Sequence, residues 1–287
     1  MSDLRNGAFR PMTVTARLGQ AVKKGGDTVA DINYQAELLQ IMQTTTRIRL
    51  EELTRQLVNI VGRKVQTGPF AGMLLEGGAC YSGDVSTLIL GCYEAELHDA
   101  IETSIAREPD VVINVGGALG YYAVGLARRL PRAHIHVFDI QEKARMACAN
   151  IAQANGVADR VSIGGRCDSA QLVELARSGK KALLVMDIDG GEIDVIDDAA
   201  VEGLKNCDII VECHDFINKN ITPTLMSRLK RHHDVSVVYE GARNPTEFKI
   251  LSTLTTFERF LMVCDNRPGL QSWMICWAND PAHQQPA

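Results

Sequence analysis

Five polar residues that end two apolar runs of the chain could together transfer protons or hold a metal ion. Asp187 and Asp189 end one run, and Glu212, His214 and Asp215 end the next. Side chains alternate along a strand, so Glu212 and His214 point to the same side. Ligands of open parallel sheets bind beyond the carboxyl ends of the strands. We therefore expect these five side chains to converge on one bound molecule.

Three interpretations of this acidic group are open. In the first, His214 is a general base assisted by Asp187 and Glu212, since a histidine pKa of ~6.5 suits proton transfer near neutral pH. In the second, a divalent cation such as Mg²⁺ is held by Asp187, Asp189, Glu212 and Asp215, with His214 beside them, and acidifies an acceptor hydroxyl. In the third, the carboxylates cap helices and a neighbour satisfies the histidine. The first, without a metal, is our prediction.

A glycine-rich turn follows another apolar run, at residues 111–115. Gly116 and Gly120 permit a positive φ and a close approach of the backbone to a ligand, and a helix begins at Tyr121 with free N–H groups. Asp139 lies 23 residues after Gly116, at the end of the next apolar run. A carboxylate there can accept hydrogen bonds from ribose hydroxyls. The turn and the acid together predict a cofactor that contains adenosine.

The spacing of the turn distinguishes between cofactors. A dinucleotide fingerprint needs glycines where Ala118 and Tyr121 stand, which counts against a nicotinamide cofactor. The spacing Gly116-x-Ala118-x-Gly120 instead resembles motif I of class I S-adenosylmethionine-dependent methyltransferases. Asn114 stands where that motif has an acid, and Ala118 where it has its middle glycine.

The resemblance continues on both sides of the turn and covers about residues 90 to 215. Residues 185–192 are similar to the signature of FkbM-type methyltransferases, with Asp189 in place of its first glutamate. Residues 91–97 resemble the Tyr-Glu segment that precedes motif I in that family. An acidic residue that meets the adenine amino group follows the third strand, and Asp168 matches it.

The resemblance implies a fold, a cofactor and an activity. The fold is α/β, a doubly wound, mostly parallel seven-stranded sheet, and the activity is O-methylation of a small molecule or a sugar-containing metabolite. N-methylation of an amino acid or peptide-like substrate is the alternative. The residues implied in binding S-adenosylmethionine are Glu94, Asn114, Gly116, Gly117, Ala118, Gly120, Tyr121, Asp139, Ile140, Cys167, Asp168 and Asp187.

Two other functions are alternatives to methyl transfer. The first, a nicotinamide-dependent oxidoreductase, is disfavoured because the turn lacks two glycines of the dinucleotide fingerprint. A non-catalytic assembly module leaves Asp139, Asp168, Asp187 and His214 without an explanation. Loops at residues 65–85, 215–222 and 240–250 are expected to build the acceptor pocket, because loops vary most freely.

Four further polar residues are interpreted as ordinary structural ones. Glu192 opens a helix and is expected to interact with the helix dipole. His232 and His233 are expected to decorate the surface, since adjacent residues do not share a helix face. Arg243 is expected in solvent, with an acidic substrate group as its alternative partner.

The alternation of short apolar runs with helical segments predicts the elements that position these residues. Apolar runs bounded by helices are typical of a parallel sheet covered on both faces, and the last two strands could close its edge in antiparallel pairing. The expected strands are 111–115, 135–138, 161–163, 182–187, 208–213, 235–239 and 272–277. The expected helices are 86–106, 121–129, 142–155, 170–178, 195–204 and 222–231.

The first part of the chain has a different pattern. Residues 1–85 are predicted to form a helical extension with a glycine-rich connector, and 86–287 the methyltransferase domain. Residues 1–27 are expected to be a loose arm. Apolar residues recur at helical spacing over 30–64, and this stripe must be buried on the body or against a second subunit. We expect a homodimer through this region.

Net charge and the pattern of cysteines limit the classes of protein and the cellular compartments that fit this sequence. The net charge is −5, made of +4 over residues 1–64 and −9 over 65–287, which argues against a general nucleic-acid binder. The eight cysteines form no CxxC pair and no zinc spacing, which fits a reducing compartment. No apolar stretch approaches the ~18 residues of a membrane span. We therefore expect a cytoplasmic protein that acts away from membranes.

Overall fold

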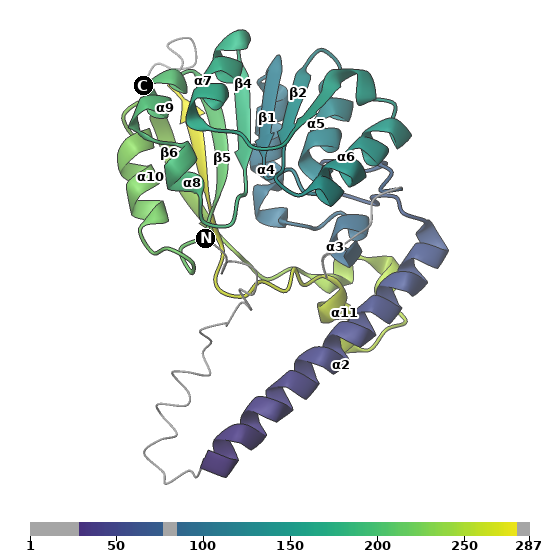
Figure 1. Ribbon diagram of the computed structural model, residues 1–287. Coiled ribbons are helices and arrows are strands. Elements are labelled where there is room, and N and C mark those ends of the chain that lie inside the picture. The colour runs from purple at the N-terminus through teal and green to yellow at the C-terminus, as the bar shows by residue number, and fades with distance from the viewer. Residues whose placement is uncertain (1–28, 77–84, 280–287) are drawn as a thin grey trace, which may run out of the picture.

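A computed structural model describes residues 29–76 and 85–279, and within it seven strands form one sheet in the order β3-β2-β1-β4-β5-β7-β6 (Figure 1). Neighbouring strands among β1 to β5 pair in parallel, whereas β7 is antiparallel to both β5 and β6. The predicted doubly wound, mostly parallel seven-stranded sheet is thus confirmed, including its antiparallel edge. The strands are β1 Val111–Val115, β2 His134–Phe138, β3 Val161–Gly164, β4 Ala182–Met186, β5 Cys207–Cys213, β6 His233–Tyr239 and β7 Ser272–Ala278.

Helices cover both faces of this sheet. The α-helices are α2 Val29–Val61, α3 Val85–Leu90, α4 His98–Ala106, α5 Tyr121–Arg129, α6 Glu142–Ala154, α7 Ser169–Ser178, α8 Glu192–Val195, α9 Asp198–Gly203, α10 Ile221–Leu229 and α11 Thr256–Met262. Short 3-10 helices are η2 Ala95–Leu97, η3 Ala158–Arg160, η4 Pro245–Glu247 and η5 Lys249–Leu251.

The central strands are buried on both faces, which explains their continuous apolar runs. Every residue of β1 and β4 is buried. Along β1, Val112 belongs to a core with α5 and α6, whereas Ile113 belongs to a second core with α7, α9 and α10. Alternate side chains of one strand therefore fill two cores, as the pleat requires.

Two helical predictions differ from the structure. The segment 86–106 is divided into α3 and α4, and Gly91 and Glu94 between them both have a positive φ. The segment 195–204 is divided into α8 and α9. In both places the apolar spacing continues through the break, so helical periodicity alone does not reveal it.

Helix α2 is buried only along its C-terminal half. Leu50, Leu53 and Leu57 enter the same core as β1 and α5, and α2 packs against α3 and α11. The N-terminal half extends beyond the body (Figure 1). The body therefore covers only the C-terminal half of the stripe, and burial of the other half against a second subunit stays a prediction. Phe70 of the connector is buried in this same core, so the predicted extension and the predicted domain share one core. The boundary between them at residue 85 stays a prediction.

An isolated antiparallel bridge joins Lys64 to Leu74 in the segment that follows α2. The predicted loose arm at residues 1–27 lies outside the described residues. No helix in the described part of the chain is long and apolar enough to cross a membrane.

Replacing Gly116 with alanine is expected to lower the free energy of unfolding by roughly 2–4 kcal/mol. Gly116 has φ +80°, and an added Cβ would lie 1.6 Å from the carbonyl oxygen of Asp187. Gly165→Ala is the matched control, because an added Cβ there meets nothing within 4 Å. Urea denaturation of both variants measures the difference, and equal stabilities would contradict the requirement for glycine at residue 116.

Candidate active site

The carboxyl ends of three parallel strands bring the predicted site residues together. Asp139 follows β2, Asp187 follows β4, and Glu212 and His214 lie at the end of β5. Two cavities of about 90 and 350 Å³ open there, and Gly116 and Asp187 line both. One continuous site therefore runs from the glycine turn to the acidic group.

The larger cavity has the acceptors that an adenosine group needs. Asp139, Ile140 and Cys167 line it. The two carboxylate oxygens of Asp139 each accept one backbone hydrogen bond, from Ala118 N at 2.9 Å and from Gln141 N at 2.8 Å. A carboxylate has about four acceptor positions, so two ribose hydroxyls can still be accommodated.

Asp168 has a structural task in addition to its predicted one. Its side chain caps α7 by accepting a hydrogen bond from Gln171 N at 2.9 Å, and it is not among the residues that line the larger cavity. Its contact with an adenine amino group stays a prediction. Asp139, by contrast, is not the cap of α6, because Gln141 holds that position.

The smaller cavity has polar atoms that the described chain leaves without partners. Glu94, Asn114, Ala118 and Tyr121 line it, together with Glu212. Asn114 donates to the carbonyl of Val185 at 3.2 Å, but its Oδ1 is buried and has no partner, and the same holds for the hydroxyl of Tyr121. Buried polar atoms are rarely left unpaired. These atoms therefore fit a polar group of a bound molecule, such as an amino-acid ammonium or carboxylate.

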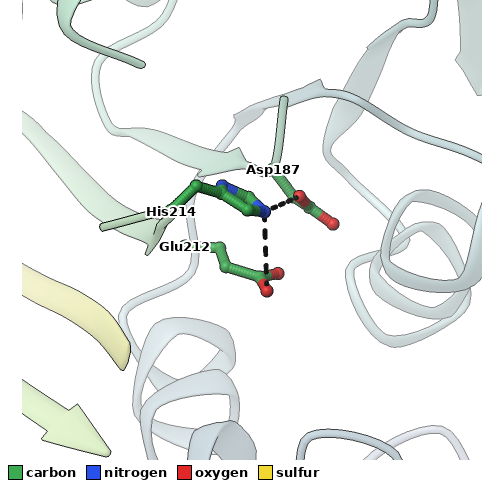
Figure 2. Close-up of side chains that lie close together, drawn as sticks. All are labelled: Asp187, Glu212 and His214. Carbon is green, nitrogen blue, oxygen red and sulfur yellow. Dashed lines mark ion pairs between the residues drawn. The ribbon is translucent and has the colours of Figure 1, made fainter. Parts of the chain in front are cut away.

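His214 lies deep in the acidic group and is oriented by Glu192. The histidine is 3% exposed, and its Nδ1 lies 2.6 Å from Glu192 Oε1. Because a carboxylate can only accept, this contact places a proton on Nδ1 and leaves Nε2 for chemistry. Nε2 faces Asp187 Oδ1 at 3.4 Å and Glu212 Oε1 at 3.8 Å (Figure 2).

Glu192 opens α8, as predicted, but its side-chain partner was missed. Its side chain is fully buried and also accepts a hydrogen bond from Gly190 N at 3.1 Å. Burial raises the pKa of this carboxyl, yet the hydrogen bonds from His214 and the backbone outweigh burial and lower the pKa overall. Glu192 is therefore a charged partner of His214.

Three residues of the acidic group, Asp187, Glu212 and His214, have pKa values raised above their ordinary values. Burial lowers the pKa of His214, but the hydrogen bond to Glu192 and the charge of Asp187 outweigh it, so the pKa rises above 6.5. Burial and the charge of Glu94 raise the pKa of Asp187 to about 7. Burial, Glu94 and Asp187 raise the pKa of Glu212 as well.

An arginine that the sequence analysis missed neutralises part of this charge. Arg267, from the loop before β7, donates to Glu94 and lies 2.9 Å from Glu212 Oε1. Its guanidinium lies 5.4 Å from the centroid of Tyr93 and 5.7 Å from that of Trp273. Nothing in the pattern around residue 267 marks it, because it lies far along the chain from both carboxylates.

The predicted metal ligands are only partly brought together. Asp187, Glu212 and His214 each offer one ligand atom, and these atoms lie within 4.8 Å of one another (Figure 2). Asp189 lies 3.6 Å from His214, but its side chain is 90% exposed. Asp215 is used elsewhere, because it accepts hydrogen bonds from the backbone and hydroxyl of Thr222.

Two surface predictions are corrected by burial. His233 is buried at the start of β6 and contacts the carbonyl of Cys207 at 2.9 Å, whereas His232 does lie nearer the surface beside Glu202. The side chain of Arg243 is 8% exposed and pairs with Glu96 and Asp265. Arg243 therefore connects the loop after β6 to η2. Its charge is compensated by the carboxylates of Glu96 and Asp265, and not by solvent or a substrate.

The sequence matches no protein-family model and no curated protein. Among solved structures, the O-methyltransferase TomG of Streptomyces achromogenes, involved in tomaymycin synthesis and in complex with SAM, is 14% identical with a TM-score of 0.43; the match covers 63% of this chain and 78% of that one. A geranyl diphosphate methyltransferase in complex with GPP and sinefungin is 10% identical, with a TM-score of 0.41 and coverage of 69% and 81%.

An rRNA methylase of Streptococcus thermophilus is also similar, at 10% identity and a TM-score of 0.40, with coverage of 64% of this chain and 96% of that one. Likenesses this distant carry no information about activity. The function must therefore be argued from the site.

Proposed function

We propose that this chain is an S-adenosylmethionine-dependent methyltransferase. One observation carries the proposal: the cavity beside Asp139 and the cavity beside the acidic group meet at Gly116 and Asp187. The first offers acceptors for a ribose, and the second offers unpartnered polar atoms on Asn114 and Tyr121. A cofactor with a nucleoside at one end and an amino acid at the other fits both.

The charges around the smaller cavity support a cofactor with positive groups. Glu94, Asp187 and Glu212 line it, and Arg267 is the cation that pairs with two of them. When bound, S-adenosylmethionine supplies a methyl group on a positively charged sulfur. The carboxylates stabilise such a charge through space, with Glu94 placed to bind an ammonium group.

His214 has the arrangement of a general base. Glu192 fixes the proton on Nδ1 and the orientation of the ring, so the lone pair of Nε2 can take the proton of an acceptor hydroxyl. Asp187 and Glu212 then stabilise the imidazolium. Because neutral histidine is the active form, the rate should rise with pH through the raised pKa of His214.

The proposed acceptor is a small molecule or a sugar-containing metabolite that is methylated on oxygen. Phe216 packs on His214 with ring centroids 5.6 Å apart, and Phe216 and Ile217 are both partly exposed. An apolar part of the acceptor can therefore lie beside the base. N-methylation of an amino acid or peptide-like substrate is the alternative, because an amine also needs to lose one proton.

A metal-assisted reaction is a second candidate at the same site. Asp187, Glu212 and His214 would hold a divalent ion such as Mg²⁺, which would lower the pKa of a bound hydroxyl. The guanidinium of Arg267 on Glu212 opposes it, because a dication would meet a second positive charge there. Activity that is lost with a chelator and restored by Mg²⁺ would favour the metal over His214 as the base.

The place of action that we propose is the cytoplasm. All seven cysteines of the described part of the chain are free, and six of them are buried. Unpaired cysteines fit a reducing compartment. The negative body and the acidic site likewise favour a small molecule over a nucleic acid as the partner.

Asp139→Ala is expected to weaken binding of S-adenosylmethionine by about 10- to 100-fold, because hydrogen bonds to a charged group contribute roughly 1.5–3 kcal/mol. Isothermal calorimetry with the cofactor and with S-adenosylhomocysteine measures the effect. Glu142→Ala, an exposed acid in the first turn of α6, is the matched control and should bind as the unchanged protein does. Absence of cofactor binding by the unchanged protein would refute the proposed function.

A further inference from the structure

The N-terminal half of α2 exposes large apolar side chains. With 33 residues the helix is ~50 Å long, and its first half extends beyond the body (Figure 1). Tyr34, Ile41 and Ile48 are 66%, 58% and 54% exposed, and Leu38 is 44% exposed. Single exposed apolar residues are ordinary, but a contiguous group of them marks an interaction site.

These residues have the spacing of a coiled-coil seam. Tyr34, Leu38, Ile41, Thr45 and Ile48 follow one another at steps of 4, 3, 4 and 3, and we call these five residues the α2 seam. This spacing alternates between the two core positions of a heptad, so the five side chains lie along one side of the helix. The residues that pack on the body, Leu50, Leu53 and Leu57, continue along a different side.

The lack of charge on this segment indicates what covers it. Among residues 34–48, Glu37 and Arg47 are the two charged side chains, and neither belongs to the seam. A strongly acidic or basic partner would find almost nothing to pair with. A second copy of the same seam meets no like charge within it, and its apolar side chains can interdigitate with themselves.

Helix α11 extends the apolar surface beside α2. Arg49 donates to Glu258 with Nε 2.8 Å from Oε1, which holds α11 against α2, and Phe257 and Phe260 of α11 are 63% and 53% exposed. Together with the apolar seam residues and Met42, they expose on the order of 700 Å², close to the ~800 Å² that each partner buries in a stable interface.

We propose that a second copy of this chain packs on the α2 seam and the neighbouring face of α11, so that the protein is a homodimer held by its projecting helices. This surface lies outside the proposed active site, and its assembly does not depend on the proposed activity.

The test is the mass of the protein in solution. Sedimentation velocity or light scattering of the full chain should give twice the 31.4 kDa of one chain at micromolar concentration. The double variant Ile41→Glu/Ile48→Glu should give one chain, since four carboxylates would meet at the seam. Gln40→Glu/Gln43→Glu adds the same charge at exposed positions outside the seam and should remain a dimer.

A second measurement separates lost assembly from lost folding. Because a dimer is stabilised by mass action, the unfolding temperature of the unchanged chain should rise with protein concentration, and that of the seam variant should not. The variant should keep the circular dichroism of the folded body, since both changed residues are exposed. An unchanged chain that is monomeric up to about 100 µM, or a dimeric seam variant, would overturn the proposal.

Discussion

Replacing His214 with glutamine is expected to slow methyl transfer by about 10²- to 10⁴-fold, the usual contribution of a positioned general base. The affinity for S-adenosylmethionine should change little, because the contacts assigned to the cofactor are made by Asp139, Asn114 and Glu94. Release of S-adenosylhomocysteine in the presence of a panel of small hydroxyl compounds measures the rate. His232→Gln, at a histidine near the surface beside Glu202, is the matched control.

The pH dependence separates a base from a group that only fills space. The pKa of His214 lies above 6.5 because of Glu192 and Asp187, so the rate should rise with pH above that value. In Glu192→Gln the charge that favours the imidazolium is lost while burial remains, so the rising limb should move to lower pH. A profile that stays in place, or a His214→Gln variant of unchanged rate, would remove His214 from the role of base.

Replacing Arg267 with methionine is expected to lower the free energy of unfolding by about 3–5 kcal/mol, the range for breaking a buried ion pair from one side. The substitution keeps much of the packing against Tyr93 and Trp273 but leaves Glu94 and Glu212 without their cation. Urea denaturation at pH 7 measures the loss. Arg132→Met is the control: this exposed arginine pairs with Glu108 on the surface and should cost at most ~1 kcal/mol.

The sign of the pH effect follows from the same carboxylates. Burial and the charges of Glu94 and Asp187 raise the pKa of Glu212 above its value in the unfolded chain, so Glu212 binds a proton on folding. The Arg267→Met variant should therefore regain stability as the pH falls from about 8 to 5. The double variant Arg267→Met/Glu94→Gln should recover part of the loss, because one unpaired charge is removed. A loss below ~1 kcal/mol, or one that grows toward low pH, would contradict this account.

Local pattern was enough to place most of the candidate site. Asp187 and Glu212 could be predicted because each belongs to the end of a continuous apolar strand, and the carboxyl ends of parallel strands meet at one edge. The glycine turn and Asp139 were found in the same way. Helix breaks were missed where apolar spacing continued through them, as at Gly91 and Glu94.

The burial of three polar residues could not be predicted in this way. His233 and Arg243 were expected at the surface, because charged and polar residues usually lie there, and Glu192 was expected to interact with a helix dipole. Each is buried because a partner distant in sequence compensates it: Cys207 for His233, Asp265 for Arg243, and His214 for Glu192. The spacing of residues along the sequence does not reveal which distant residues become such partners.

The sequence by itself determined the seven strands and their order along the chain, the glycine turn that follows β1, and the identity of the side chains at the carboxyl ends of the strands. These depend on local periodicity and on the conformational freedom of glycine, which act within a few residues. Only the tertiary structure decided that Glu192 orients His214, that Arg267 joins Glu94 to Glu212, and which half of α2 is covered. Those depend on contacts between segments far apart in the chain, where burial makes each unpaired charge costly and therefore selects its partner.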